Sequence, residues 1–247
     1  MPEHAYLKGF STLPDLKKIS FDQVFEKDHS NSAEIQKEKS KALKDRLCFF
    51  EKNVNDQIYD RCKDFILKYY PTSLKSSEYI DIAREVDEDL IIHRQSGDDD
   101  WMASGHVCLP SSWDPSEKIG LSFDEMHAPV PMSLKNSSKI VKAIINSGPF
   151  ERYLWSVVYE KKYDFHPSTN SKKFDKFNPE VYVKIERQIT VGFPEENFCL
   201  FILRQYLIEE KDIDKRGLIQ SIQNMTCEQK KYKGLLNSEE LIEYLRN

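Results

Sequence analysis

The 247-residue chain is poor in several features that define whole classes of protein. Its eight glycines argue against a collagen-like or Gly-rich linker sequence. Its five cysteines include no Cys-x-x-Cys pair, so neither a zinc ribbon nor a Cys-ligated iron–sulfur cluster is expected. The net charge of −5 gives no sign of the basic surface that nucleic-acid binding needs. No apolar run approaches the roughly 18 residues that a membrane-spanning helix requires.

The N-terminal segment also lacks a secretory signal, and Glu3 and Asp15 count against a mitochondrial one, which stays an open alternative. MPEHAYLKGFSTLPDL has neither the basic start nor the apolar run of a secretory signal peptide. An odd number of widely spaced cysteines fits reduced thiols in a reducing compartment. We therefore expect a cytoplasmic protein with no membrane and no nucleic-acid partner.

What the sequence does contain is enough apolar residues for a core. Hydrophobic residues make up 39% of the chain and aromatic residues 12%. No repeat and no linker-like segment divides it. These observations predict one domain over residues 1–247, of the α+β class.

Periodicity predicts helices at both ends of the chain and strands between them. After an extended lead-in over residues 1–30, one helix is expected from Ser32 and a second after a cap at Asn53. A further helix is expected through Leu134 and Ile145, and three more near 211–223, 226–232 and 237–246. Alternating apolar residues and turn signals predict one antiparallel sheet of five strands. The strands are centred near residues 91, 105, 157, 186 and 202.

His127 is the first candidate site residue. It leads into Ala-Pro-Val-Pro, where Pro129 and Pro131 fix φ and favour extended conformations at Ala128 and Val130. A histidine on so stiff a backbone suits metal or haem ligation, because imidazole is the commonest metal-ligating side chain. The alternative is a histidine that is hydrogen-bonded within an ordered loop.

Two arginines form the second candidate group. Arg187 lies in phase with the apolar residues of its strand, and Arg204 does the same on the next strand. An arginine on an apolar face needs an anion, because a buried unpaired charge costs several kcal/mol. The anion is either a ligand carboxylate, such as a haem propionate, or an internal acid such as Asp87, Glu88 or Asp89.

Short sequence segments along nearly the whole chain resemble the alpha subunit of the haem-dependent oxidative N-demethylases (the DUF3445 family, related to dimethylamine monooxygenase). They occur in the same order as in that family. The most specific pair is PSSW followed by HAPVP. The matching segments are YLKGFSTL (6–13), VDEDLIIHR (86–94), VCLPSSW (107–113), KIG (118–120), HAPVP (127–131), IERQIT (185–190), FILRQY (201–206) and YKGLL (232–236).

The resemblance implies a PAS-like core, in which a five-stranded antiparallel sheet with helices beside it encloses haem b. It also implies histidine ligation of the iron, and His127 is the histidine that lies in a matching motif. The resulting candidates for cofactor binding are His127, Arg187, Arg204, Gln188 and Trp155, with His127 as the metal ligand.

The chain departs from the family pattern at one informative position. The family has Arg-x-Asn-Trp before the third-strand tryptophan, whereas this chain has Arg152-Tyr153-Leu154-Trp155. Losing the amide removes a hydrogen-bonding group near the expected pocket, which puts the substrate chemistry in doubt. Lys184, where family members often have arginine, is a milder change.

Three functions follow from these observations. The first is a haem-dependent oxygenase that removes a methyl group from a small amine as formaldehyde. It would take its electrons from a separate reductase subunit, because the chain has no flavin-binding glycine motif and no cysteine cluster. The second is a non-catalytic haem or small-ligand sensor on the same fold, and the third is a scaffold that has lost haem.

Overall fold

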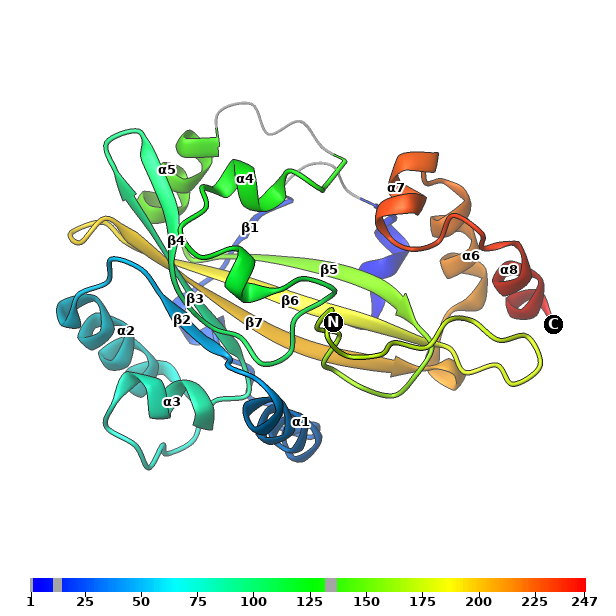
Figure 1. Ribbon diagram of the computed structural model, residues 1–247, viewed down its shortest axis with the longest axis horizontal. Coiled ribbons are helices and arrows are strands. Elements are labelled where there is room, and N and C mark those ends of the chain that lie inside the picture. Colours follow the sequence, from blue (N-terminus) through cyan, green and yellow to red (C-terminus); the bar gives the residue numbers. More distant parts are fainter. Residues whose placement is uncertain (1, 11–14, 132–136) are drawn as a thin grey trace.

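The structure, a computed structural model, describes residues 2–10, 15–131 and 137–247 (Figure 1). Its centre is one antiparallel sheet of seven strands, in the order β1-β5-β6-β7-β3-β4-β2. The five long strands are the five that the sequence predicts. Their bounds are β3 (Asp89–Ser96), β4 (Asp99–His106), β5 (Phe150–Val158), β6 (Tyr182–Phe193) and β7 (Phe198–Glu209).

The α+β class is therefore confirmed, but a count of five strands was too low. The two additional strands are β1 (Lys17–Lys18) and β2 (Phe49–Glu51), which pair with β5 and β4 at the two edges of the sheet. Strands of two and three residues are too short to show alternation, so they leave no pattern in the sequence.

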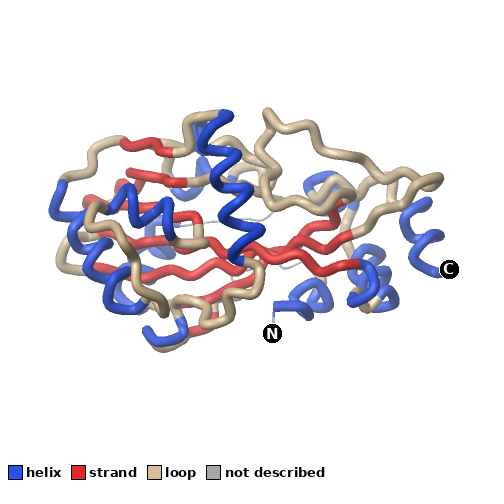
Figure 2. Tube along the Cα trace, turned by 90° about the horizontal axis from the view of Figure 1, so that it is seen from below, coloured by secondary structure: helices blue, strands red, loops and turns tan. Residues whose placement is uncertain are grey.

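Helices pack on both faces of the twisted sheet, whose strands Figure 2 shows in red. On the N-terminal side of the sequence are α1 (Ser32–Asp45), α2 (Asp56–Tyr69) and α3 (Tyr79–Glu85). Between β4 and β5 are α4 (Phe123–His127) and α5 (Ser137–Ser147), and after β7 come α6 (Lys215–Gln223), α7 (Cys227–Tyr232) and α8 (Glu239–Arg246). In Figure 1, α4 and α5 lie toward one end of the sheet and α6, α7 and α8 toward the other.

Most of the expected helices are confirmed, with three differences. Asn55 rather than Asn53 caps α2, its side chain accepting from the N–H of Ile58 at 3.1 Å. The lead-in is not wholly extended, because Pro2–Lys8 forms a 3-10 helix. The short helices α3 and α4 were not predicted, and the expected contribution of Leu134 to α5 lies outside the described residues.

The two faces of the sheet bury different sets of residues. One face carries Arg187 and Arg204, which are directly opposite each other on β6 and β7, and we call it the Arg187 face. Its apolar residues form one cluster with α2 and α3 and a second with α6 and α8. The arginine pair lies between these two clusters.

The opposite face carries Glu186, Gln188 and Gln205, and we call it the Glu186 face. Apolar residues of α4 and α5 pack on it against Cys199 of β7. Gly192 makes this packing possible, because a Cβ at that position would lie only 2.0 Å from the carbonyl oxygen of Ile145. The glycine thus lets the end of α5 rest directly on β6.

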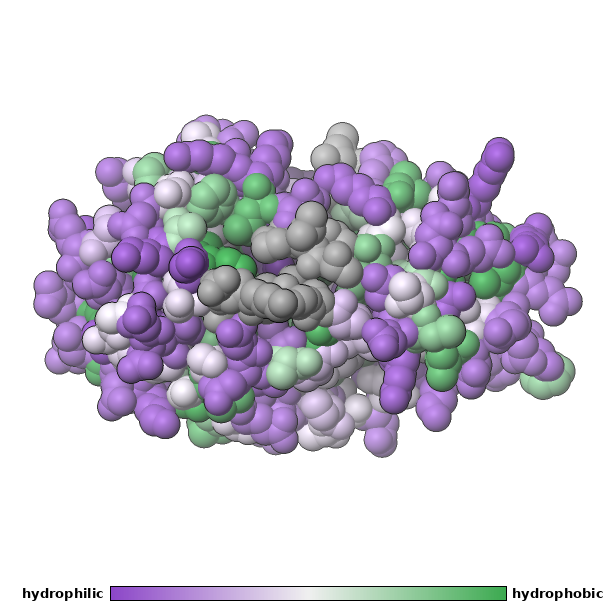
Figure 3. Space-filling model, turned by 90° about the horizontal axis from the view of Figure 1, so that it is seen from above, coloured by the Kyte–Doolittle hydropathy of each residue, from purple (hydrophilic) through white to green (hydrophobic). Residues whose placement is uncertain are grey.

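The outer surface fits a protein in which 31% of residues are charged. Figure 3 shows hydrophilic side chains over most of one side, with apolar atoms gathered in a few patches. All five cysteines are within the described residues and are free thiols, in agreement with the reduced state that we expect. Among the described helices none has the length and apolar character needed to cross a membrane.

Candidate functional site

The five predicted site residues do not come together in the structure. Gln188 lies on the Glu186 face, and His127 ends α4, which packs on that same face. Arg187, Arg204 and Trp155 lie on the Arg187 face. The sheet itself separates the two groups, so they cannot contact one ligand.

His127 is positioned by a short, strongly capped helix. Ser122 and Glu125 form a capping box at the start of α4, and His127 is its last residue. Ala128 continues the helical conformation with φ −51° and ψ −35°, so our expectation of an extended residue there was wrong. The capped turn outweighs the steric preference that the following proline imposes.

The imidazole of His127 is held in one tautomer. Its Nδ1 lies 2.7 Å from the carbonyl oxygen of Phe123, which accepts a hydrogen bond and so requires the proton on Nδ1. The ring also lies against that of Phe123, with centroids 4.2 Å apart. Burial lowers the pKa of His127 to about 4, and the charge of Arg152 adds to this effect. The ring is therefore neutral at pH 7, with the lone pair of Nε2 available to a ligand.

A polar cluster centred on Glu186 occupies the middle of the same face. The Glu186 carboxylate accepts from the hydroxyl of Ser111 at 3.0 Å and from the amide of Gln205 at 2.9 Å. The amide of Gln188 also donates to it, and Nε of Arg152 donates to the Gln188 carbonyl oxygen at 2.6 Å. We call these five residues the Glu186 cluster.

Two cations in and beside this cluster have no close anion. Among the described residues, neither Arg152 nor Lys233 has a carboxylate at ion-pair distance. Lys233 donates to the carbonyl oxygen of Trp155 at 2.5 Å, and burial lowers its pKa to about 8. Burial also lowers the pKa of Arg152, with Glu186 opposing that shift. Two half-buried cations facing one carboxylate leave an excess of positive charge that favours an anion.

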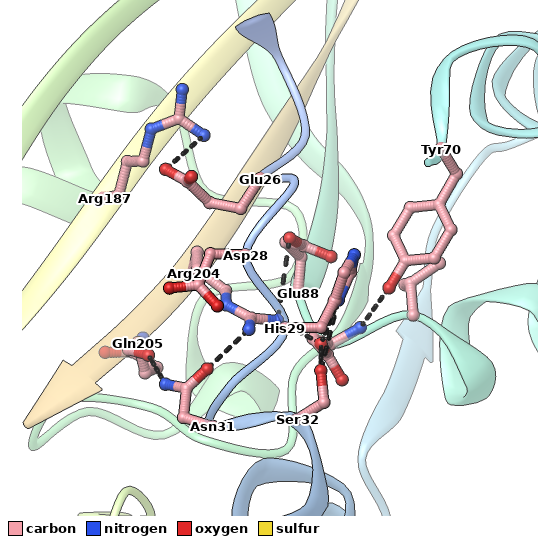
Figure 4. Close-up of polar contacts among 12 residues, drawn as sticks. Glu26, Asp28, His29, Asn31, Ser32, Tyr70, Glu88, Arg187, Arg204 and Gln205 are labelled. Carbon is pink, nitrogen blue, oxygen red and sulfur yellow. Dashed lines mark hydrogen bonds and ion pairs between the residues drawn. The ribbon is translucent and has the colours of Figure 1, made fainter. Parts of the chain in front are cut away.

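The Arg187 side chain, by contrast, is fully paired. Its Nε donates to Glu151 at 2.8 Å, and its Nη1 and Nη2 donate to the carbonyl oxygens of Val24 at 3.0 Å and Gln23 at 2.5 Å. Glu26 adds a second carboxylate at 3.4 Å (Figure 4). The guanidinium thus has anions from within the chain, although they are not the acids that the sequence suggested.

Arg204 does pair with the expected internal acids. Its Nη1 lies 2.5 Å from Asp87 and 3.9 Å from Glu88, and its Nη2 donates to the side chain of Asn31 at 2.6 Å. Figure 4 shows the segment from Glu26 to Ser32 lying across both arginines. The two like charges are stable side by side because each has its own carboxylates.

Trp155 serves the packing of the Arg187 face. Its Nε1 donates to the carbonyl oxygen of Gly9 at 3.0 Å, and its ring meets Tyr6 edge-on. The ring is buried among the residues that join β5 and β6 to α6 and α8. These contacts fix the N-terminal segment against the sheet.

A buried group of potential metal ligands lies elsewhere, near one end of β3 and β4. Ligand atoms of Asp89, His106 and Cys108 lie within 4.8 Å of one another. However, the Asp89 carboxylate already accepts from the backbone N–H groups of Cys108 at 2.9 Å and Leu109 at 2.7 Å, and the ammonium of Lys39 lies 3.9 Å away. A divalent cation would be placed beside a buried positive charge, so we interpret this group as a structural ion pair.

Leu154 occupies a revealing position. It lies opposite Glu186 in the β5–β6 register and is 37% exposed. Strand β5 is next to the edge of the sheet, and β1 pairs with it only at Phe150 and Glu151. An asparagine there, as the family pattern has it, would place an amide directly beside the Glu186 cluster. The departure therefore affects the site and not the core.

The residues of the Glu186 face fit a haem group. A neutral histidine with one ring nitrogen available could ligate haem iron, and Arg152 and Lys233 would offer positive charge to the propionates. Sequence reasoning did not select Arg152, Glu186 or Lys233. The available signal was their position inside or beside the family segments, because Glu186 lies in IERQIT and Lys233 in YKGLL.

Comparison with known protein families agrees with this fit. A family model described as haem-dependent oxidative N-demethylase, alpha subunit-like, matches residues 49–242. The matched region contains the five long strands, His127 and the whole Glu186 cluster. It covers well over half of the chain, and we conclude that the protein belongs to the haem-dependent oxidative N-demethylase, alpha subunit-like family.

Proposed function

We propose that this protein is a haem-binding subunit of an oxygenase that demethylates a small amine, and that it binds haem b on the Glu186 face. The observation that carries the proposal is the state of His127. Its Nδ1 is engaged by the Phe123 carbonyl oxygen. In the part of the chain that the structure describes, its Nε2 has no hydrogen-bond partner, and two cations of the same face have no carboxylate at ion-pair distance. We take residues 1–247 as one domain with a PAS-like core of the five long strands.

Each side chain of the site has a role in this proposal. His127 ligates the iron through Nε2, while the Phe123 carbonyl holds the ring, as outer partners of ligating histidines usually do. Arg152 and Lys233 neutralise the propionates. Gln188 links Arg152 to Glu186 and so limits the directions in which the guanidinium points. Arg187, Arg204 and Trp155 are not part of the proposed site, because they lie across the sheet.

The bound haem supplies the activation of O2 that oxidation of an N-methyl group requires. The protein orients the amine, excludes water and retains the cofactor. Glu186 is a buried carboxylate that accepts from Ser111 and Gln205, and it holds these side chains in place beside Arg152. Electrons come from a separate reductase subunit, as the alpha-subunit character of the family suggests.

An absorbance spectrum tests the proposal most directly. Protein expressed with haem precursor supplied is expected to show a Soret band. His127→Ala is expected to remove or displace that band, and added imidazole to restore it in part, because free imidazole can replace the missing side chain as a ligand. His4→Ala is the matched control, since His4 is exposed and lies outside the site.

Two results would contradict the proposal. If the parent binds haem and His127→Ala keeps an identical spectrum, His127 is not the ligand. If the parent binds no haem at all, a scaffold without cofactor is the remaining function.

A non-catalytic haem or small-ligand sensor is the second candidate, and Leu154 favours it. An apolar, partly exposed side chain replaces the family amide beside Glu186, so a polar contact near the ligand is lost. Amine-dependent consumption of NAD(P)H with a reductase distinguishes the two functions. The sensor binds haem but gives no such turnover.

A further inference from the structure

A buried carboxylate fixes the start of the helix that carries His127. Asp100, on β4, accepts a hydrogen bond from the backbone N–H of Phe123 at 2.6 Å, and Phe123 is the first residue of α4. The same carboxylate oxygen lies 2.7 Å from Nε2 of His93, which is fully buried on β3. The start of α4 is thus anchored to two strands of the sheet.

Phe123 connects this anchor to His127. Its N–H donates to Asp100, while its carbonyl oxygen accepts from Nδ1 of His127 at 2.7 Å. Its ring packs between the two histidines, with centroids 4.2 Å from that of His127 and 6.0 Å from that of His93. Phe123 therefore links the imidazole of His127 to the strands, and its position determines where the ring lies.

Such an anchor is needed because α4 has only five residues. A helix of that length is not stable by itself, and its exposed capping box contributes only about 1 kcal/mol. A carboxylate that accepts a backbone N–H inside the protein is a stronger contact, because both groups are shielded from water.

We propose that Asp100, supported by His93, is a positioning residue for His127. It holds Phe123 so that the carbonyl oxygen of Phe123 meets Nδ1–H, which leaves Nε2 unprotonated and directed away from α4. The consequence for haem rests on the proposed function, whereas the effect on the tautomer of His127 does not.

The tautomer can be measured directly by 15N NMR of the histidine side chains in the protein as isolated. The signals of His127 are assigned by their loss in His127→Ala. The parent is expected to show the Nδ1–H tautomer alone. Asp100→Ala is expected to give a mixture of both tautomers, because the Phe123 carbonyl is no longer held against the ring.

Two further variants make the measurement specific. Asp100→Asn keeps an oxygen in the place of Oδ1, which can accept from both Phe123 and His93, so it is expected to retain the parental tautomer. Asp114→Ala is the matched control. Asp114 caps another short helical segment through Ser116 at 2.8 Å, so its removal is also expected to leave His127 unchanged.

A folded Asp100→Ala protein with parental His127 signals would overturn the inference. If that variant does not fold, Asp100→Ser gives the same test with a side chain too short to reach Phe123. In haem-loaded protein, Asp100→Ala is expected to weaken haem binding by about 10–100-fold, as loss of an outer partner usually does. A changed tautomer with unchanged haem affinity supports the positioning role and contradicts haem ligation by His127.

Discussion

The two faces of the sheet differ in whether their buried cations are paired with carboxylates. On the Arg187 face, Arg187 and Arg204 are surrounded by four carboxylates and by backbone carbonyl oxygens. On the Glu186 face, Arg152 and Lys233 face a single carboxylate that neutral donors already engage. The comparison teaches that burial of an arginine does not by itself mark a binding site. A buried cation that has no carboxylate at ion-pair distance among the described residues is the better indicator.

The largest expected difference between the two faces is in stability. Arg204→Leu leaves Asp87 and Glu88 buried without their cation, and we expect a loss of about 3–5 kcal/mol in the free energy of unfolding. Arg152→Leu, the matched variant on the other face, is expected to cost about 1 kcal/mol or less. Urea unfolding of both variants measures the difference, and equal losses would remove the distinction between the faces.

The contribution of Asp87 to the stability of the Arg187 face is expected to depend on pH. Burial acts to raise the pKa of Asp87, but the hydrogen bonds and charge of Arg204, with help from Ser32, hold it lower, at about 2 against an ordinary 3.8. Because the folded pKa is the lower one, the stabilisation is complete above about pH 4 and disappears as the pH falls through about 2. We expect Asp87→Asn to be about 2 kcal/mol less stable at pH 7.

Unfolding curves at several pH values check this expectation. The difference between parent and Asp87→Asn should narrow from pH 4 downward. A constant difference over that range would show that the carboxylate is not stabilised in the folded state.

For haem affinity we expect the opposite result, with larger effects from variants on the Glu186 face than from variants on the Arg187 face. Arg152→Gln and Lys233→Gln are each expected to reduce haem affinity about tenfold, since a hydrogen bond to a charged group is worth about 1.5 kcal/mol. Arg187→Leu is the control, and it is expected to lose stability without a specific loss of affinity. Haem titrations on folded protein decide the matter. If Arg187→Leu reduced haem affinity more than Arg152→Gln and Lys233→Gln do, haem would bind on the Arg187 face instead.

Leu154→Asn is expected to have the smallest effect on stability, within about 0.5 kcal/mol, because the side chain is partly exposed and lies outside the core clusters. Its effect should appear in the site, as altered binding of amines to the haem-loaded protein. Thermal melts and amine titrations monitored by absorbance separate the two. Loss of folding in this variant would show that Leu154 packs in the core after all.

The long strands could be predicted because alternation and turn residues determine them locally. Gln95, Asp99 and Gly97 around the β3–β4 turn illustrate this, since the hairpin follows from a few neighbouring residues. The edge strands β1 and β2 could not be predicted, because their pairing partners are more than 50 residues away in the sequence.

The site was harder to predict for a related reason. Both faces of β6 are buried, so alternation separates Arg187 from Glu186 without saying which face binds a ligand. The acceptors of Arg187 include the backbone carbonyl oxygens of Val24 and Gln23, which no local pattern connects to it. His127 was chosen as a candidate because the residues around it form a recognisable motif, whereas Arg152 lacked such a signal.

The bonds from Arg187 to Gln23 and Val24 also have a consequence for the order of events during synthesis. These partners are 164 and 163 residues apart in the chain. The lead-in leaves the ribosome long before β6 has been synthesised. Until then Arg187, to which Gln23 and Val24 bind in the folded protein, is not present. Closure of the Arg187 face is therefore a late step of folding, dominated by contacts of high sequence separation. Until that step the nascent N-terminal segment is available to chaperones and proteases.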